Sequence, residues 1–223
     1  EKSSITAGTK ANIINLSRQA IINDDMGAFN RLATMLGRAA KLSIEMDIYD
    51  LLALNSGLGP TMSDGLTLFH ATHNNISTGA ALTAAAIDLD RVAMGSQKDP
   101  SGNEILDLRP AVLLLPLSLG STARTINDAQ YDPDTANKLQ KPNAVRGLFG
   151  TIVDTARLSG TRRYLFADPS VAPTLEVAFL DGAQEPYLDM QEGWRVDGVE
   201  WKVRHDYATA GVDWRGAVTN AGQ

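Results

Sequence analysis

The strongest pattern of hydrophobic positions predicts one long helix in the first quarter of the chain. Apolar side chains recur there every three or four residues, at Phe29, Leu32, Leu36, Ala40, Ile44, Ile48, Leu51 and Leu52. Asn23, Asp24 and Asp25 precede this repeat, and such short polar side chains accept hydrogen bonds from the free N–H groups of a first helical turn. The Asn-Ser-Gly sequence at 55–57 is typical of a helix end. We therefore predict a helix over residues 24–55, a rod of about 45 Å at the usual rise per residue.

Shorter elements follow from local periodicity and turn residues. In chain order, we predict extended structure at 11–22, a helix at 83–98 capped by Thr83, a strand at 111–115, a helix at 121–129 and a long loop at 131–150. The loop contains two prolines and two glycines, and loops of this length inside compact domains are usually functional.

The last third of the chain is predicted to be rich in strands. The candidates are residues 164–167, 175–180, 194–196, 199–204 and 212–218. Trp201, Val203 and His205 alternate with charged residues, which indicates a strand with two different faces. The Asp-Gly pair at 197–198 predicts a two-residue hairpin turn. Because strands and helices do not alternate regularly, we predict an α+β fold with mixed sheets.

Composition narrows the possible classes of protein. The chain has 223 residues and no cysteine, which excludes disulfides and thiolate metal sites. Its net charge of −6 argues against a sequence-specific DNA-binding protein. No apolar run approaches the roughly 18 residues of a membrane span. The chain begins at Glu1 without an initiator methionine or a visible signal peptide, so we expect a processed product or a piece of a longer chain.

The polar residues form no strong catalytic pattern. His70 and His73 lie three residues apart, a spacing that lets two histidines share a metal on one helical turn. The surrounding sequence is rich in turn residues, however, and we interpret both as polar side chains that fix a loop. Glu45, Asp47 and Asp50 do not stack on one helical face. We therefore expect no enzyme activity, no cofactor and no metal.

Two groups of residues are candidates for contacts between protein subunits. Arg157, Arg162 and Arg163 form the densest basic cluster, without the spacing of a phosphate-binding loop. We favour salt bridges between subunits for this cluster over contacts with nucleic acid. Trp214 and Arg215 are adjacent, and these two residue types are favoured anchors of protein interfaces. Core packing is the alternative for the tryptophan.

An ordered set of short segments resembles the major head subunits of Mu-type phages. The segments are RQAIINDDMGAF at 18–29, LFHATHN at 68–74, RLSGT at 157–161, YLFADP at 164–169, LEVAFLDG at 175–182, VDGV at 196–199, KVRHD at 202–206 and VDWRG at 212–216. Each segment alone is weak evidence, but the ordered set spans most of the chain and is specific.

The resemblance implies the Hong Kong 97-type capsid fold, with a long spine helix, peripheral and axial domains, and mixed and antiparallel sheets. It implies that residues 1–23 end an extended loop and lead into the spine, and that 24–130 form a peripheral domain passing into the axial domain. Residues 131–165 would form the axial-domain loop and its flanks, and 166–223 would return to the peripheral domain. Axial domains meet their copies at the centre of a capsomer. The full set of expected intersubunit contacts is Arg146, Phe149, Arg157, Arg162, Arg163, Trp214 and Arg215.

The resemblance also implies partners and a location. The chain is expected to assemble with itself, as hexamers and pentamers, into an icosahedral head that encloses double-stranded DNA. A portal, a scaffold or protease and decoration proteins are the other expected partners, and the DNA is expected in weak, non-specific contact only. We expect no membrane partner, a place in the virion, and assembly in the bacterial host cytoplasm. In relatives, a prohead protease can be fused ahead of the capsid region.

Three alternatives remain open at the level of the sequence. An encapsulin-like shell that holds a cargo enzyme would share the same fold. A metal-dependent hydrolase using His70 or His73 is the alternative from a different class. A tail or baseplate protein would assemble into tubes or rings instead of closed shells.

Overall fold

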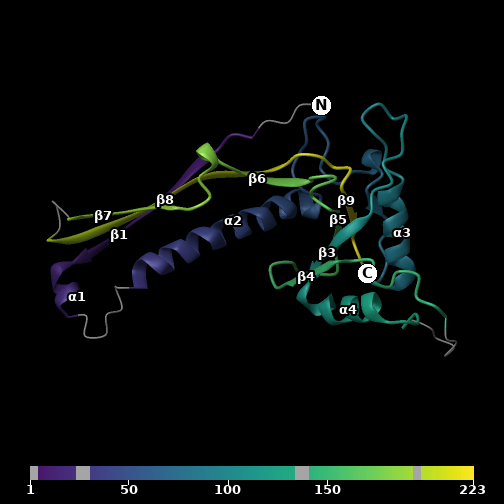
Figure 1. The fold of residues 1–223 in the computed structure, drawn as a ribbon, viewed down its shortest axis with the longest axis horizontal. Helices are drawn as coiled ribbons and strands as arrows, with labels where there is room; N and C mark the ends of the chain where they lie inside the picture. The colour runs from purple at the N-terminus through teal and green to yellow at the C-terminus, as the bar shows by residue number, and fades with distance from the viewer. Residues whose placement is uncertain (1–4, 24–30, 134–140, 193–196) are drawn as a thin grey trace. The chain divides into compact units, whose positions relative to one another are not determined.

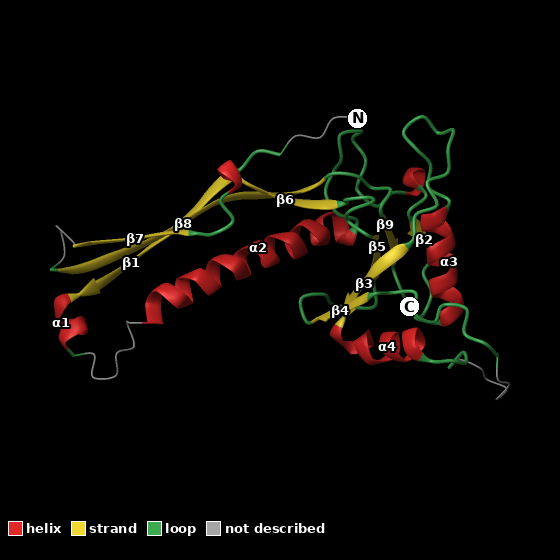
Figure 2. Ribbon diagram, in the orientation of Figure 1, coloured by secondary structure: helices red, strands yellow, loops and turns green. Residues whose placement is uncertain are grey.

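The computed structural model describes residues 5–23, 31–133, 141–192 and 197–223 (Figures 1 and 2). The helices are α1 (Arg18–Ile22), α2 (Leu32–Gly57), α3 (Ala84–Gly95) and α4 (Gly120–Asp128), with 3-10 turns at η2 (Ala71–His73), η3 (Leu117–Leu119) and η4 (Leu180–Gly182). The strands are β1 (Gly8–Ser17), β2 (Ile76–Ser77), β3 (Pro110–Pro116), β4 (Thr151–Thr155), β5 (Arg163–Ala167), β6 (Leu175–Phe179), β7 (Tyr187–Glu192), β8 (Gly198–Gly211) and β9 (Ala217–Asn220). They form two compact units: unit 1 contains residues 51–176 and 211–223, and unit 2 contains the described residues up to 50 together with 177–210.

Unit 1 is built around a mixed five-stranded sheet with the order β2-β9-β5-β3-β4. Leu113, Leu165 and Val218 lie side by side across β3, β5 and β9, and all three are fully buried. The helices α3 and α4 cover this face, because their buried residues Ile87 and Ile126 belong to the same hydrophobic cluster.

The opposite face of this sheet is also covered. Tyr164 of β5 packs against Phe69 with 5.4 Å between the ring centroids, and its hydroxyl donates to the Gly57 carbonyl at 3.0 Å. Leu52 and Leu68 are buried with them. The last turns of α2 and the segment that follows therefore form a second layer on the sheet of unit 1.

Unit 2 is built around the long strand β8. Antiparallel β1 pairs with it from Gly8, opposite Tyr207, to Ser17, opposite Gly198. The strands β7 and β6 also pair with β8. His205 and Tyr207 are buried, whereas Lys202 and Arg204, which precede them on the other face of the strand, are exposed. The predicted two-faced strand is therefore confirmed.

An ionic hydrogen-bond network ties three elements of unit 2 together. The Lys10 ammonium on β1 lies 2.5 Å from Asp47 of α2, and the Tyr207 hydroxyl on β8 donates to the same carboxylate at 2.6 Å. Burial alone would raise the pKa of Asp47, but the hydrogen bonds from Lys10 and Tyr207 together lower it. The network therefore holds the carboxylate ionised where the helix meets the sheet.

The end of the long helix agrees with its sequence. Asn55 and Ser56 adopt left-handed backbone angles, with φ of 52° and 61°, and the Asn55 side chain donates to the Gly59 carbonyl at 2.8 Å. Gly57 has φ of 85°, and a Cβ there would lie 2.9 Å from the Arg162 side chain. A glycine is required at this position for both reasons. The predicted start of the helix at residues 24–30 lies outside the described residues.

Several predicted elements differ in detail from the structure. Residues 18–22 form helix α1 and not a continuation of the strand, because the Ser17 hydroxyl caps the helix by accepting from the Ala20 N–H. The Asp-Gly pair at 197–198 does not form a two-residue hairpin, because Glu192 is paired with Val199. The last strand is β9 at Ala217–Asn220, and not 212–218. The predicted strand at 194–196 lies outside the described residues.

The two compact units divide the chain in another way than the domain boundaries implied by the resemblance, which stay a prediction. Residues 51–130 belong to the same unit as 131–165, and residues 211–223 belong to it as well. The reason is hydrogen bonding within one sheet: β5 pairs with both β3 and β9, so these distant segments share a core.

Candidate assembly surfaces

Arg163, predicted to bridge subunits, lies instead at the centre of unit 1. Its side chain is fully buried and forms an ion pair with Asp90 of α3, whose side chain is also fully buried. The guanidinium Nε donates to Asp90 at 2.9 Å, and Nη1 donates to the Ala80 carbonyl at 2.9 Å. The second carboxylate oxygen of Asp90 accepts from the Asn220 amide at 3.0 Å. This network joins β5, α3 and β9.

Two other predicted contact residues are also buried. Phe149 is part of the hydrophobic cluster between α3, α4 and the sheet. The Arg215 guanidinium donates to the Lys98 carbonyl at 3.0 Å and lies 3.1 Å from Asp213. A buried side chain cannot contact a neighbouring subunit without rearrangement, so the prediction is corrected for Arg163, Phe149 and Arg215.

The remaining predicted contact residues lie at the surface. Arg146 and Arg157 are exposed, and Arg162 and Trp214 are partly exposed. The Arg162 side chain reaches Thr219 of β9 at 3.4 Å. Trp214 is stacked on His73 with 4.3 Å between the ring centroids and 4° between the ring planes. The guanidinium carbon of Arg215 lies 4.5 Å from the Trp214 ring centroid. Intersubunit contact by these four surface residues stays a prediction.

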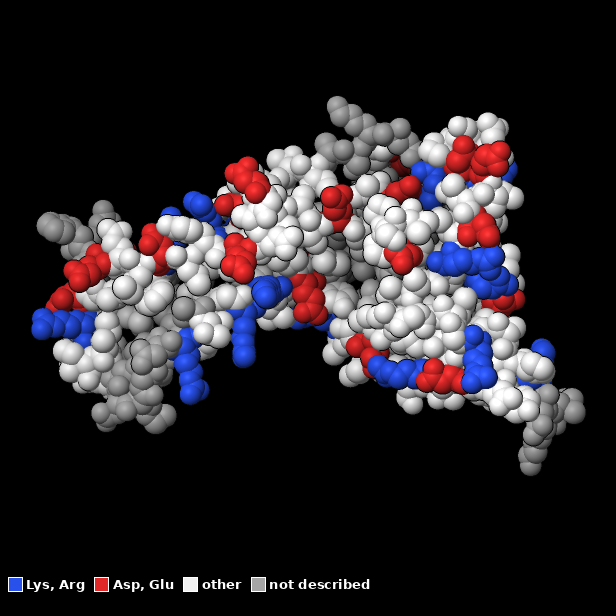
Figure 3. All heavy atoms as spheres, in the orientation of Figure 1, with Lys and Arg blue, Asp and Glu red and all other residues white. Residues whose placement is uncertain are grey.

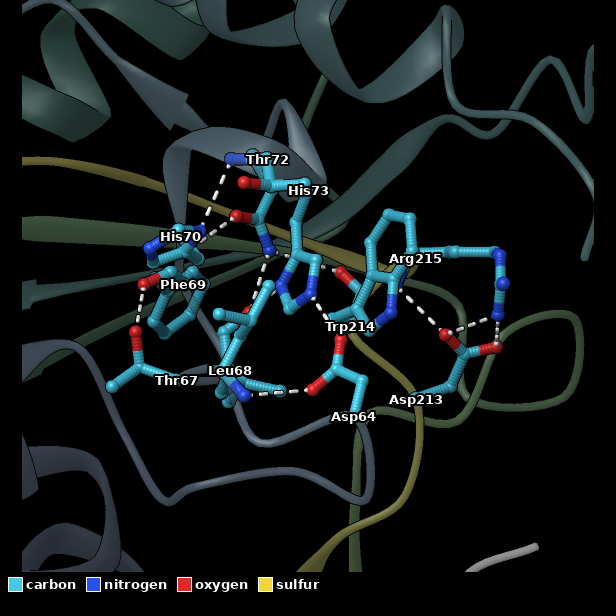
Figure 4. Close-up of polar contacts among 12 residues, drawn as sticks. Asp64, Thr67, Leu68, Phe69, His70, Thr72, His73, Asp213, Trp214 and Arg215 are labelled. Carbon is cyan, nitrogen blue, oxygen red and sulfur yellow. Dashed lines mark hydrogen bonds and ion pairs between the residues drawn. The ribbon is translucent and has the colours of Figure 1, made fainter. Parts of the chain in front are cut away.

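The two neighbouring histidines are structural, as the sequence suggested (Figure 4). The His70 ring accepts from the Thr72 N–H at 3.1 Å and caps η2. His73 is buried, with Nε2 2.7 Å from Asp64 and Nδ1 3.2 Å from the Leu68 carbonyl. The interpretation of these residues as fixing a loop is confirmed. Within the described ranges, no three His, Asp or Glu side chains gather closely enough to hold a metal ion.

The stability of this cluster depends on pH through the Asp64 carboxyl group. The Leu66 N–H donates to the Asp64 carboxylate at 2.9 Å, and this hydrogen bond lowers the pKa of Asp64. Partial burial raises the pKa, and the hydrogen bond with His73 lowers it further. The pKa of Asp64 therefore lies below its ordinary 3.8. A carboxyl with a lowered pKa contributes stability at pH values above its unfolded-state pKa, and that contribution is lost as pH falls through the lowered value.

We therefore expect Asp64→Asn to destabilise the chain near pH 6 and to flatten its loss of stability below about pH 4. Thermal unfolding measured from pH 6 to pH 2 tests this, and parallel curves for the two proteins would contradict it.

Charge on the visible surface is mixed. Acidic and basic residues are interspersed on the face shown in Figure 3. On α4, Arg124 forms an ion pair with Asp154 of β4, and on α3, Arg91 pairs with Asp88 at 2.7 Å. Such a surface does not have the continuous basic stripe that nucleic-acid binding uses.

No helix in the described part of the chain is both long and apolar enough to cross a membrane.

Sequence reasoning missed the acidic partners of these buried groups. Asp64 and Asp90 were not singled out, although they hold His73 and Arg163. Asp90 follows Leu89 in a helical repeat where it looks like an ordinary surface residue. The burial of Asp90 could have been found from its position on α3. Each residue turns the helix by about 100°, so Asp90 lies on the same side as Ile87 and Met94.

The fold is shared with several phage proteins and one encapsulin. A chain from Mycobacterium phage Patience is 9% identical, with 98% of this chain and 70% of that chain covered and a TM-score of 0.61. The capsid of cyanophage P-SCSP1u is 9% identical, with 98% and 73% covered and a TM-score of 0.57. The SrpI encapsulin of Synechococcus elongatus PCC 7942 is 10% identical, with 96% and 73% covered and a TM-score of 0.56. At these identities, the likeness shows the fold alone.

The family itself is shown by sequence. The model of the family described as phage capsid protein matches residues 1–220, almost the whole chain. No curated protein matches the chain. The Hong Kong 97-type fold predicted from the ordered segments is confirmed by the solved structures that share it. Because the family match and the shared fold agree along the same residues, the chain belongs to the phage capsid protein family, as a structural major capsid protein.

Proposed function

We propose that copies of this chain assemble as hexamers and pentamers into the closed icosahedral head of a tailed phage, around its double-stranded DNA. The observation that carries the proposal is the family match over residues 1–220, together with a fold that recurs in a cyanophage capsid. A portal, a scaffold or protease and decoration proteins are the partners we propose beside the chain itself. Assembly in the cytoplasm of the bacterial host belongs to the same proposal.

The surface of the chain supports assembly through many modest contacts. Large apolar side chains are exposed in both units, among them Leu89, Ile105 and Leu117 in unit 1 and Ile13 and Met190 in unit 2. In a shell each subunit meets several neighbours, so weak contacts reinforce one another and no single interface has to be strong. Arg146, Arg157 and Arg162 are proposed as polar contacts at these interfaces.

The role proposed for DNA is enclosure with weak, non-specific contact. The net charge is −6, and Arg91 and Arg124 are each paired with an aspartate of the same chain. Strong binding to the phosphate backbone depends on Lys and Arg side chains that neutralise several phosphates. The protein is therefore proposed to act through its shape and its subunit contacts.

Co-expression of the full-length gene product with its head-morphogenesis partners tests the proposal. We expect closed shells of uniform diameter in negative-stain electron microscopy and a single fast species in sedimentation velocity. Tubes or rings would indicate a tail or baseplate protein instead. A product that stays monomeric with all partners present would contradict self-assembly.

A cargo-holding shell is the second candidate, because the SrpI encapsulin shares the fold. The contents of purified particles separate the two candidates. Particles with nuclease-protected DNA and a portal at one vertex support the phage head, whereas particles that contain a co-expressed enzyme and no DNA support the cargo shell.

A further inference from the structure

The first part of α2, which belongs to unit 2, has two apolar sides. Leu36 lies on the side that packs on the sheet, where it is buried and lines a small cavity together with Val203 of β8. Met35, Leu42 and Met46 lie on another side, about 100° around the helix from Leu36. They are 62%, 46% and 44% exposed, in that order. A surface helix normally carries polar residues outside its packed side, so the second apolar side requires an explanation.

The exposed apolar residues follow the repeat by which one helix packs on another. They are spaced four, three and four residues apart, at Met35, Ala39, Leu42 and Met46, and all four are exposed. Spacing that alternates between three and four residues keeps side chains in one row along a helix. The row is about 16 Å long at the usual rise per residue. We call these four residues the α2 seam.

Positive charge borders the α2 seam on one side. Arg31 and Arg38 each precede a seam residue, Met35 or Leu42, by four positions, which is about one helical turn. Both arginines are exposed, and neither forms an ion pair with a residue that the structure describes. The sequence has no acidic residue between 31 and 44. The seam therefore carries uncompensated positive charge, although the whole chain has a net charge of −6.

We propose that the α2 seam is the docking site of an amphipathic helix from another protein, with an apolar row of the same spacing and acidic residues opposite Arg31 and Arg38. Two such rows bury each other, and each carboxylate gives an arginine a charge-assisted hydrogen bond. A second copy of α2 would bring two more arginines to the same interface, which like charges disfavour. DNA would attract the arginines, but its phosphates would leave the apolar row uncovered.

The first test measures the binding of two labelled peptides to the unassembled full-length subunit by fluorescence anisotropy. Both peptides have about three heptads with Leu at the two apolar positions. One has Glu at the positions that flank the apolar row, and the other has Lys there. We expect the Glu peptide to bind at least about tenfold more tightly than the Lys peptide. Equal affinities, no binding of either peptide, or equally tight binding of a short DNA duplex would overturn the proposal.

The second test reverses one charge beside the seam and one charge away from it. Arg38→Glu is matched by Lys41→Glu on the same helix, because Lys41 is also exposed but lies about 60° further from the seam. We expect Arg38→Glu to weaken binding of the Glu peptide at least about fivefold and Lys41→Glu less than about twofold, with both melting temperatures unchanged. Equal losses would show a general attraction between opposite charges and no docked helix.

The third test does not depend on a change of charge. Because the chain has no cysteine, Leu42→Cys carries one thiol in the seam, and Thr122→Cys on α4 is an exposed control. We expect saturating Glu peptide to slow maleimide labelling of the first thiol at least about tenfold and to leave the second unchanged.

Two outcomes of this labelling experiment contradict the proposal. Unchanged labelling of Leu42→Cys would show that the peptide binds elsewhere. Slow labelling without peptide, together with dimers in sedimentation velocity, would show that a second copy covers the seam. All three tests use the unassembled subunit, so their failure would leave the proposed shell intact.

Discussion

Replacing Asp90 with alanine is expected to lower the free energy of unfolding by about 3–5 kcal/mol, the largest effect of any single change considered for this chain. The substitution leaves the Arg163 guanidinium without its counter-charge in a position where neither side chain has any exposed surface. It also removes one of the two acceptors of the Asn220 amide, which keeps its bond to the Thr78 carbonyl. Urea unfolding of the unassembled subunit, followed by circular dichroism, measures the difference.

Two control variants separate the charge from the packing. Asp90→Asn keeps a side chain of similar shape and is expected to lose most of the same stability, because the charge on Arg163 stays unpaired. The double variant Asp90→Leu with Arg163→Met removes both charges and is expected to recover much of the loss, since apolar groups of similar volume replace buried ion pairs well. If Asp90→Ala unfolds at the same urea concentration as the wild type, the ion pair does not hold unit 1 together.

Replacing Trp214 with alanine is expected to cost about 3 kcal/mol. The indole is stacked on the buried His73 ring, and the Arg215 guanidinium lies over the same indole. Its removal opens a gap between the loop that carries His73 and the segment leading to β9, and exposes Arg215 and His73 to water. The loss is expected in the thermal unfolding of the full chain, and in faster hydrogen exchange of the amides in residues 68–75.

The control for this change is Trp214→Phe. A phenyl ring keeps a flat surface against His73 and is expected to retain more than half of the stability that alanine loses, because stacking area decides the effect. If phenylalanine and alanine destabilise equally, the indole N–H or its exact size matters more than the stack. If neither destabilises, the stack between His73 and Trp214 contributes nothing to unit 1.

Elements with a local signal could be predicted from the sequence. Thr83 accepts from the Ala86 N–H at 3.1 Å and caps α3, and the Asn-Ser-Gly sequence at 55–57 ends α2. In both cases the atoms that decide the boundary lie within three or four residues of one another. The apolar run of β3 was recognised for a similar reason, since a strand that is covered on both faces is apolar along its length.

Elements that depend on distant residues could not be predicted in this way. The strand β4 lies at the edge of the sheet and becomes a strand through its parallel pairing with β3. All residues of β7 are exposed, so it shows no alternation of buried and exposed positions. The partner of Arg163 is 73 residues away along the chain, and no local pattern distinguishes a buried arginine from one at the surface. This is why the predicted contact residues included three that the fold buries.

The pairing of β1 with β8 has a consequence for synthesis on the ribosome. Gly8 is paired with Tyr207, so the first strand leaves the exit tunnel long before its partner has been translated. At bacterial elongation rates of about 5–20 residues per second, the delay is roughly 10–40 s. During this time β1 presents unsatisfied backbone groups and the apolar side chains of Ile13, Ile14 and Leu16, which are features of nascent chains that aggregate.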